Sequence, residues 1–195
     1  MSLREKKTAK RKEEILKSAL SLLAEKGYHG TTMEDIASHL LMTKGSIYYY
    51  FKDKQDLVYQ SQVKILQKSI ENINEVKQQN LTIPEKLETT VALHIEYAVR
   101  DRAGFELMAN PSEIFSEDQL KEIFYLRDKY ASGYDELLQE GVDTGYFSVD
   151  DIKVVRNILL GAMNWVTQWY SADGEMNEAT FAASVASYLM RIVLK

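Results

Sequence analysis

Proline is nearly absent from this sequence, and its apolar residues recur at intervals of three and four. Pro84 and Pro111 are the only prolines in 195 residues, and the apolar–polar alternation typical of strands is missing. Proline disrupts helix interiors, and apolar spacing of three and four puts side chains on one helix face. A hydrophobic content of 45% is enough for a sizeable core. The sequence therefore predicts an all-α protein of about nine helices.

Capping signals predict where these helices begin and end. Thr32 with Asp35 forms a capping box, and Ser148 with Asp151 is interpreted as another. Gly27 and Gly145 are expected to end the helices before them. The helices are expected over residues 8–26, 32–40, 44–50, 53–79, 84–102, 116–144, 148–170 and 178–194, with a short irregular stretch after residue 102.

Charge is divided unevenly along the chain. The formal net charge is −5, yet residues 1–60 carry 11 lysines and arginines against 8 acidic residues. The remainder carries 13 against 21. A basic head on an acidic body indicates that only the head contacts an anionic partner.

Several function classes lack their sequence signals. The chain has no cysteine, its three histidines have no metal-ligand spacing, and no nucleophile–base set or glycine-rich phosphate loop is present. The longest apolar stretch, residues 158–166, is too short to cross a bilayer, and the N-terminus lacks the apolar core of a signal peptide. We expect a cytoplasmic protein that is not an enzyme and that uses no metal or cofactor.

The segment MTKGSIYYYFKDK, residues 42–54, places four aromatic rings in a row between lysines. Successive side chains of a helix point about 100° apart, so no single core can bury all four rings. We expect Phe51 to join Ile47 in the core, Tyr48 and Tyr49 to face DNA, and Tyr50 to lie between.

The helices expected over residues 32–40 and 44–50 match a helix-turn-helix, whose second helix enters the major groove. Lysine charge suits phosphate, hydroxyls suit phosphates or base edges, and a glycine lets the backbone approach closely. The basic run of residues 4–12 is either a solvated, disordered start or a phosphate-contacting arm. The candidate DNA-binding residues are Thr32, Thr43, Lys44, Gly45, Ser46, Tyr48, Tyr49 and Lys54.

The stretch TTMEDIASHLLMTKGSIYYYFKDKQDLV resembles the helix-turn-helix signature of TetR-family transcriptional regulators. The resemblance implies a DNA-binding head, residues 1–52, and a helical body, residues 53–195, which dimerises through its last two helices and holds a ligand pocket. The eight candidate residues occupy positions that commonly contact DNA in this family. Leu41 stands where family members often have glycine, and because leucine disfavours a positive φ, the turn is expected to be reshaped.

The body carries weaker signals. The helix expected over residues 148–170 is apolar over most of its surface, which predicts burial both in the core and against a dimer partner. Trp165 and Trp169 either line a pocket or belong to the core. An apolar pocket, or an ordinary core, would use Tyr97, Phe105, Met108, Phe124, Tyr134 and Trp165. The segment GAMNWVTQWYSADGEMNEATF is also similar to the C-terminal part of TetR-type regulators of lipid metabolism that respond to acyl-CoA.

Together these features predict a homodimeric regulator, a repressor released from a palindromic DNA operator by an apolar small molecule, with fatty acyl-CoA as the leading candidate. One alternative is a TetR-like activator or a regulator that needs no ligand. The alternative from another class is a helical enzyme with a vestigial DNA-binding head.

Overall fold

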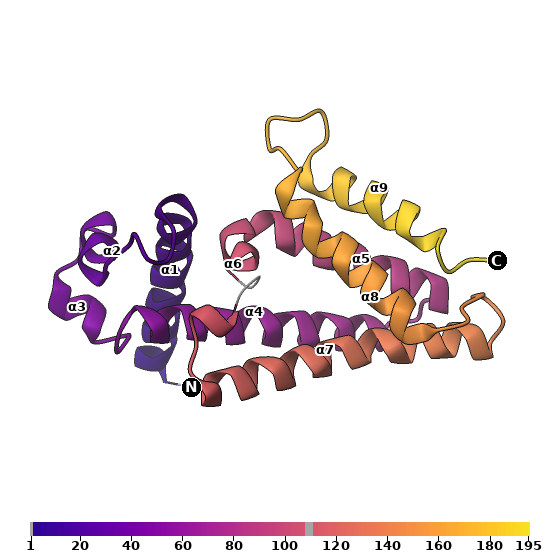
Figure 1. Cartoon of the computed structure of the whole chain (residues 1–195), viewed down its shortest axis with the longest axis horizontal. Coiled ribbons are helices and arrows are strands. Elements are labelled where there is room, and N and C mark those ends of the chain that lie inside the picture. The colour runs from indigo at the N-terminus through magenta and orange to yellow at the C-terminus, as the bar shows by residue number, and fades with distance from the viewer. Residues whose placement is uncertain (1, 108–110) are drawn as a thin grey trace. The chain divides into compact units, whose positions relative to one another are not determined.

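The computed structural model describes residues 2–107 and 111–195, and over these residues the predicted all-α fold is confirmed (Figure 1). Nine α-helices and two short 3-10 helices account for most of the described chain. In order they are α1 (Leu3–Lys26), α2 (Met33–His39), α3 (Lys44–Tyr48), α4 (Lys54–Lys77), α5 (Ile83–Arg100), α6 (Arg102–Glu106), η1 (Pro111–Glu113), α7 (Glu117–Asp143), α8 (Ile152–Trp165), η2 (Val166–Gln168) and α9 (Glu178–Met190).

The chain divides into two compact units. The head unit comprises Met1–Ile65 and Ala103–Glu122, and the body unit comprises Leu66–Arg102 and Ile123–Lys195. Helices α4 and α7 each contribute residues to both units. This division follows internal contacts, so the functional boundary predicted between residues 52 and 53 stays a prediction.

The core of the head unit is built from the apolar faces that the spacing predicted. Ile15, Ala19, Leu22 and Leu23 of α1 are all buried. Ile36 of α2 and Leu57 and Val58 of α4 are buried as well. Because these helices share one small core, each depends on the others for its position.

Helix α1 begins five residues earlier than predicted. The Ser2 hydroxyl accepts a hydrogen bond from the Glu5 amide at 3.2 Å, and the Glu5 carboxylate accepts one from the Ser2 amide at 2.8 Å. This capping box satisfies two of the amides that a helix N-terminus leaves without partners. The basic run of residues 4–12 is therefore helical.

Helix boundaries near the C-terminus differ from prediction. Asp151 caps α8 by accepting from the Val154 amide at 3.0 Å, whereas the Ser148 amide donates to the Val193 carbonyl at 2.8 Å. The predicted Ser148–Asp151 box is therefore wrong, since the Ser148 backbone is bound to the C-terminal segment. Two further boundaries differ: α8 ends at Trp165, not Tyr170, and α9 ends at Met190, not Leu194.

The C-terminal segment is held by a close contact on α7. Phe147 is buried and forms an antiparallel bridge with Leu194. Its ring lies so near Gly141 that a Cβ atom there would come within 1.9 Å of it. Glycine at position 141 thus makes room for the ring that anchors the end of the chain.

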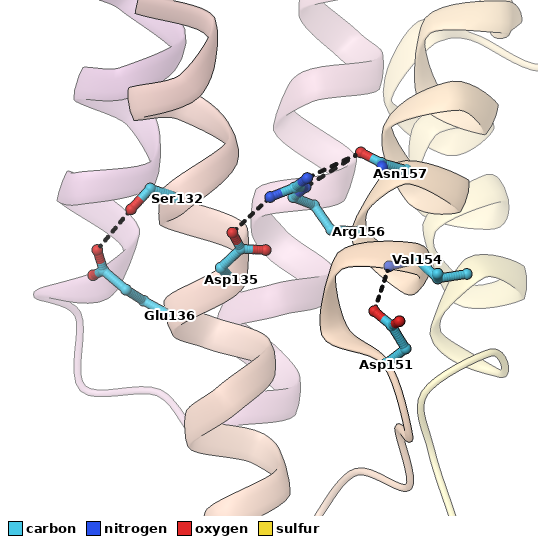
Figure 2. A network of polar contacts seen from close by, with 7 residues as sticks. All are labelled: Ser132, Asp135, Glu136, Asp151, Val154, Arg156 and Asn157. Carbon is cyan, nitrogen blue, oxygen red and sulfur yellow. Dashed lines mark hydrogen bonds and ion pairs between the residues drawn. The ribbon is translucent and has the colours of Figure 1, made fainter. Parts of the chain in front are cut away.

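An ion pair joins α7 to α8 in the body unit (Figure 2). Arg156 donates from Nη1 to the Asp135 carboxylate at 2.6 Å, and its other guanidinium nitrogens lie 3.3 and 3.2 Å from Asn157 Oδ1. The Arg156 side chain is largely buried, so its charge is partnered where water is scarce.

Both tryptophans lie at the surface, so the core alternative considered for them is wrong. Trp165 is 66% exposed and Trp169 is 55% exposed. Val154 and Ile158 of α8 are exposed too, and only Leu159 and Met163 of that helix are buried. Helix α8 is therefore apolar on a buried side and on an open side.

A chain of hydrogen bonds crosses the interior of the body unit. The Nε2 atom of His94, on α5, lies 3.1 Å from Asn164 Oδ1. An amide oxygen can only accept a hydrogen bond, so Nε2 is the ring nitrogen that carries the proton. The other ring nitrogen, Nδ1, then accepts from the Tyr130 hydroxyl at 2.8 Å, and Tyr134 donates to Tyr130 at 3.0 Å. Burial lowers the pKa of His94 from 6.5 to about 4, although the Asn164 contact opposes this shift.

The depressed pKa of His94 predicts a loss of stability in acid. Between pH 6.5 and 4 the unfolded chain binds a proton at His94 that the folded chain excludes, so lowering the pH favours unfolding. This residue alone should remove about 2 kcal/mol of unfolding free energy between pH 7 and 4.5. Denaturant unfolding of the parent and of His94→Gln at both pH values measures the difference.

The unfolding free energy of His94→Gln should depend less on pH than that of the parent. The carboxylates that titrate in this range are common to both proteins, so the difference reports on His94. Replacing the exposed His39 with glutamine is the matched control and should leave the dependence unchanged. Equal pH dependence in the parent and His94→Gln would contradict the account.

Candidate DNA-binding surface

Helices α2 and α3 are joined by a tight turn in which Leu41 is the unusual residue. Its φ is +52°, the left-handed region that leucine seldom adopts, and its side chain is 95% exposed. The Leu41 amide donates to Ser38, and the Met42 amide donates to Ala37 at 2.8 Å. The predicted reshaping of the turn is thus wrong: leucine takes the positive φ, and the backbone bonds hold it there.

Thr32 begins α2 through the predicted capping box. Its hydroxyl accepts from the Asp35 amide at 3.1 Å and donates to the Asp35 carboxylate at 2.6 Å. The bond from the Thr32 hydroxyl is the largest cause of the lowered pKa of Asp35, and the Thr32 amide, which donates to the same carboxylate at 2.8 Å, lowers it further. The hydroxyl is therefore used in the cap, and a phosphate would have to compete with Asp35 for it.

Helix α3 begins with two paired hydroxyls and a glycine. Thr43 caps it by accepting from the Ser46 amide at 3.2 Å, and the two hydroxyl oxygens are 2.8 Å apart. A Cβ atom at Gly45 would meet nothing within 4 Å. The glycine is not required by packing inside the head, and the space beside it is open to an incoming molecule.

Lys44, the first residue of α3, is paired with Glu34 of α2 across the turn. The hydrogen bond from Lys44 is the first cause of the lowered pKa of Glu34, and Glu34 in turn raises the pKa of Lys44. Both side chains are exposed, and the Lys44 ammonium lies 5.8 Å from the centre of the Tyr48 ring. A solvated pair of this kind is weak, so the lysine can exchange Glu34 for a phosphate at small cost.

The row of aromatic rings is divided as predicted. Ile47 and Phe51 are buried in the head core. Tyr48 is 41% exposed and Tyr49 is 70% exposed. Tyr50 is half-buried and holds the Tyr49 ring edge-on, with the ring centres 5.0 Å apart. One face of α3 anchors the helix, and the other presents two tyrosines.

Lys54, the first residue of α4, points back into the head. Its Nζ donates to the carbonyl of Tyr28 and, at 2.6 Å, to that of Thr31. The same ammonium lies 4.2 Å from the centre of the Tyr28 ring. Sequence reasoning assigned this charge to phosphate and could not foresee partners more than twenty residues away.

An open hollow of about 710 Å³ lies beside the turn and α3. It brings together four of the candidate residues, Thr43, Gly45, Ser46 and Tyr49, with four residues outside the candidate set: Arg11, Leu41, Met42 and Tyr50. Arg11 of α1 is the charged one of these, and the basic run of residues 4–12 was the signal that could have identified it. Thr32, Lys44, Tyr48 and Lys54 lie outside this lining.

The candidate pocket residues of the body are only partly brought together. Tyr97 lines a cavity of about 10 Å³ together with His94 and Tyr130. Tyr134 does not line this cavity, but its hydroxyl is hydrogen-bonded to that of Tyr130. Phe124 and Trp165 are exposed. Phe105 belongs to the head unit, and Met108 lies outside the described residues.

Two known proteins that are similar to this chain in sequence are named as regulators. The chain shares 25% identity with the fatty acid metabolism regulator protein of Bacillus subtilis over 182 residues, 91% of this chain and 92% of that one. It shares 44% identity over 50 residues, 26% of this chain and 27% of that one, with the biofilm operon icaADBC HTH-type negative transcriptional regulator IcaR of Staphylococcus aureus.

Solved structures show the same fold. The structure of AibR in complex with isovaleryl coenzyme A and operator DNA superposes with a TM-score of 0.79 and 22% identity, covering 92% of this chain and 98% of that one. Among the residues described for the present chain, no helix is long and apolar enough to cross a membrane.

Two sequence families match the chain in succession. Residues 15–60 match "Bacterial regulatory proteins, tetR family", and residues 80–193 match "Tetracyclin repressor-like, C-terminal domain". The first match covers α2 and α3, and the second alone covers more than half of the chain. This chain belongs to the TetR family of bacterial transcriptional regulators.

Proposed function

We propose that this regulator recognises its operator with the exposed face of α3. The observation that carries the proposal is the division of the aromatic row: Ile47 and Phe51 are buried, whereas Tyr48 and Tyr49 are exposed, and Tyr49 lines the open hollow. A tyrosine offers a hydroxyl donor and a ring face, which suit base edges and thymine methyl groups. The adjacent Lys44 supplies charge for a phosphate.

Regulators of this family bind operator DNA as dimers, so two related heads meet two related half-sites. We further propose that the chain acts as a repressor. IcaR, which shares the 44% identical segment, is named as a negative regulator. The alternative of an activator predicts that deletion of the gene lowers transcription of its target.

Two substitutions on α3 test the DNA contact. Lys44→Ala should weaken binding to all duplexes alike and reduce the slope of log affinity against log salt by about 0.9, because one phosphate is no longer neutralised. Tyr49→Ala should weaken binding to the specific duplex by about tenfold and spare a scrambled one. Fluorescence anisotropy with a near-palindromic duplex selected from random sequences by the parent protein measures both effects.

Two variants serve as matched controls on exposed sites of other helices. Lys153→Ala removes the same charge from α8, and Tyr125→Ala removes a tyrosine from α7. If the α3 variants bind like these controls, α3 does not contact DNA as proposed. A parent protein that selects no duplex would reject the function itself.

The dimer interface is proposed on the open side of α8 and the end of α9. Val154, Ile158 and Trp165 are exposed on α8, and Tyr188 is exposed on α9. A Cβ atom at Gly161 would meet nothing within 4 Å, so a second helix has room to approach closely there. Apolar side chains in this arrangement suit a helix–helix interface across a two-fold axis.

Ile158→Asp should convert the dimer into a monomer, because two carboxylates would be buried at the symmetric contact. Sedimentation velocity measures the change, and circular dichroism checks that helicity is kept. Leu3→Asp, at an exposed apolar site on α1, is the control and should remain dimeric. A folded, dimeric Ile158→Asp protein would place the interface elsewhere.

The proposed effector is a fatty acyl-CoA. The whole-length similarity to a fatty acid metabolism regulator supports this proposal, and the AibR complex holds an acyl-CoA on the same fold. The cavity beside Tyr97 is about 10 Å³, which is room for no more than one water. An acyl chain entering there must displace side chains, and a ligand that binds only the opened arrangement can shift the DNA-binding equilibrium.

Titration of long-chain acyl-CoA into the protein–DNA complex should release the duplex, with a loss of affinity of about tenfold or more. Free coenzyme A and the matching free fatty acid are the separate controls and should not release it. The emission of Trp165 and Trp169 should change saturably over the same range, since both lie at the end of α8 and in the segment after it. Retention of the duplex at saturating acyl-CoA would remove acyl-CoA as the effector.

A further inference from the structure

Lys54 connects two parts of the head that are far apart in sequence. Its Nζ donates to the carbonyl oxygens of Tyr28 and Thr31, in the turn between α1 and α2. The ammonium also lies over the Tyr28 ring, 4.2 Å from its centre. An ammonium has three N–H donors, and two are already directed at carbonyl oxygens of the head itself.

The turn that Lys54 holds fixes the start of α2. Thr31 is buried, and its hydroxyl donates to the Gly27 carbonyl at 2.9 Å, which closes the turn on itself. The next residue, Thr32, is the N-cap of α2. Helix α2 packs against both α1 and α3, so the direction in which α2 leaves the turn also sets the position of α3.

The surroundings of the Lys54 ammonium offset part of the cost of its burial. Partial burial lowers the pKa of Lys54, and the Asp35 carboxylate of the α2 capping box opposes that shift. The carbonyl oxygens and the Tyr28 ring face replace part of the water lost by the ammonium. To contact a phosphate with all its donors, Lys54 would have to abandon these partners.

We propose that Lys54 is a positioning residue for DNA recognition, a clamp that ties the first turn of α4 to the α1–α2 turn and so orients α3, and that it is not a phosphate contact. The proposal rests on the proposed use of α3 in operator binding. It also gives α4 a direct mechanical connection to the recognition helix, because α4 begins at the clamp itself.

The two roles of Lys54 predict different binding behaviour. Loss of a phosphate contact lowers affinity for every duplex alike and reduces the salt slope by about 0.9. Loss of a clamp misplaces α3, so it lowers the affinity for the selected duplex by about tenfold. The affinity for a scrambled duplex changes by no more than about twofold, and the slope of log affinity against log salt is unchanged.

Lys54→Met keeps the aliphatic stem and removes the donors, and Lys52→Met removes the same charge from an exposed neighbouring site as the control. Tyr28→Leu is the second variant: it removes the ring under the ammonium without changing any charge. The clamp predicts that Lys54→Met and Tyr28→Leu both lose specific binding, whereas a phosphate contact predicts no effect of Tyr28→Leu. Anisotropy titrations over a range of salt, with the selected and scrambled duplexes, measure these quantities.

Amide hydrogen exchange without DNA provides a readout that does not depend on operator binding. The clamp predicts faster exchange over residues 33–36 in Lys54→Met than in Lys52→Met. A reduced salt slope with equal losses on both duplexes would overturn the proposal, as would parental binding and exchange in Lys54→Met. Failure of the parent to bind any duplex specifically would instead reject the proposed function, and the exchange measurement would still decide whether the clamp exists.

Discussion

The burial of Ile47 and Phe51 is the constraint on which the candidate DNA-binding surface depends. Helix α3 spans five residues, far fewer than a helix needs to persist alone in water. These two side chains fix it to the core of the head, while the Thr43 cap and the left-handed Leu41 start it at a defined point. Once Ile47 and Phe51 face inward, helical geometry leaves Tyr48 and Tyr49 outside. The exposed face of α3, which we propose contacts DNA, is thus a consequence of core packing.

Electrostatics divides the lysines of the head into two roles. The pair formed by Lys44 and Glu34 is solvated, so its lysine can exchange Glu34 for another anion at small cost. The contacts of Lys54 are carbonyl oxygens and a ring face inside the head, and they hold backbone in place. Two lysines of the same segment therefore differ in role because their surroundings differ. A protein with a net charge of −5 can still present a basic surface locally.

Local signals in the sequence predicted much of the fold, and contacts between distant residues account for some of the errors. The Thr32–Asp35 box and the inward positions of α1 were correct because a cap and a helix face are each decided within a few residues. Ser148 resembled a cap but is bound to Val193, and the tryptophans resembled core but are exposed. For the site, the inward and outward residues of α3 followed from helical geometry. The contacts of Lys54 and the contribution of Arg11 to the hollow depend on the folded chain.

Site-specific photocrosslinking tests the central claim most directly. Benzoylphenylalanine in place of Tyr49 should crosslink to the duplex selected by the parent protein and should do so less on a scrambled duplex. The same group in place of Tyr125 or Tyr146, both exposed in the native protein, should not crosslink. Crosslinking from those control positions but not from position 49 would contradict the account, because the exposed face of α3 would then lie away from the DNA.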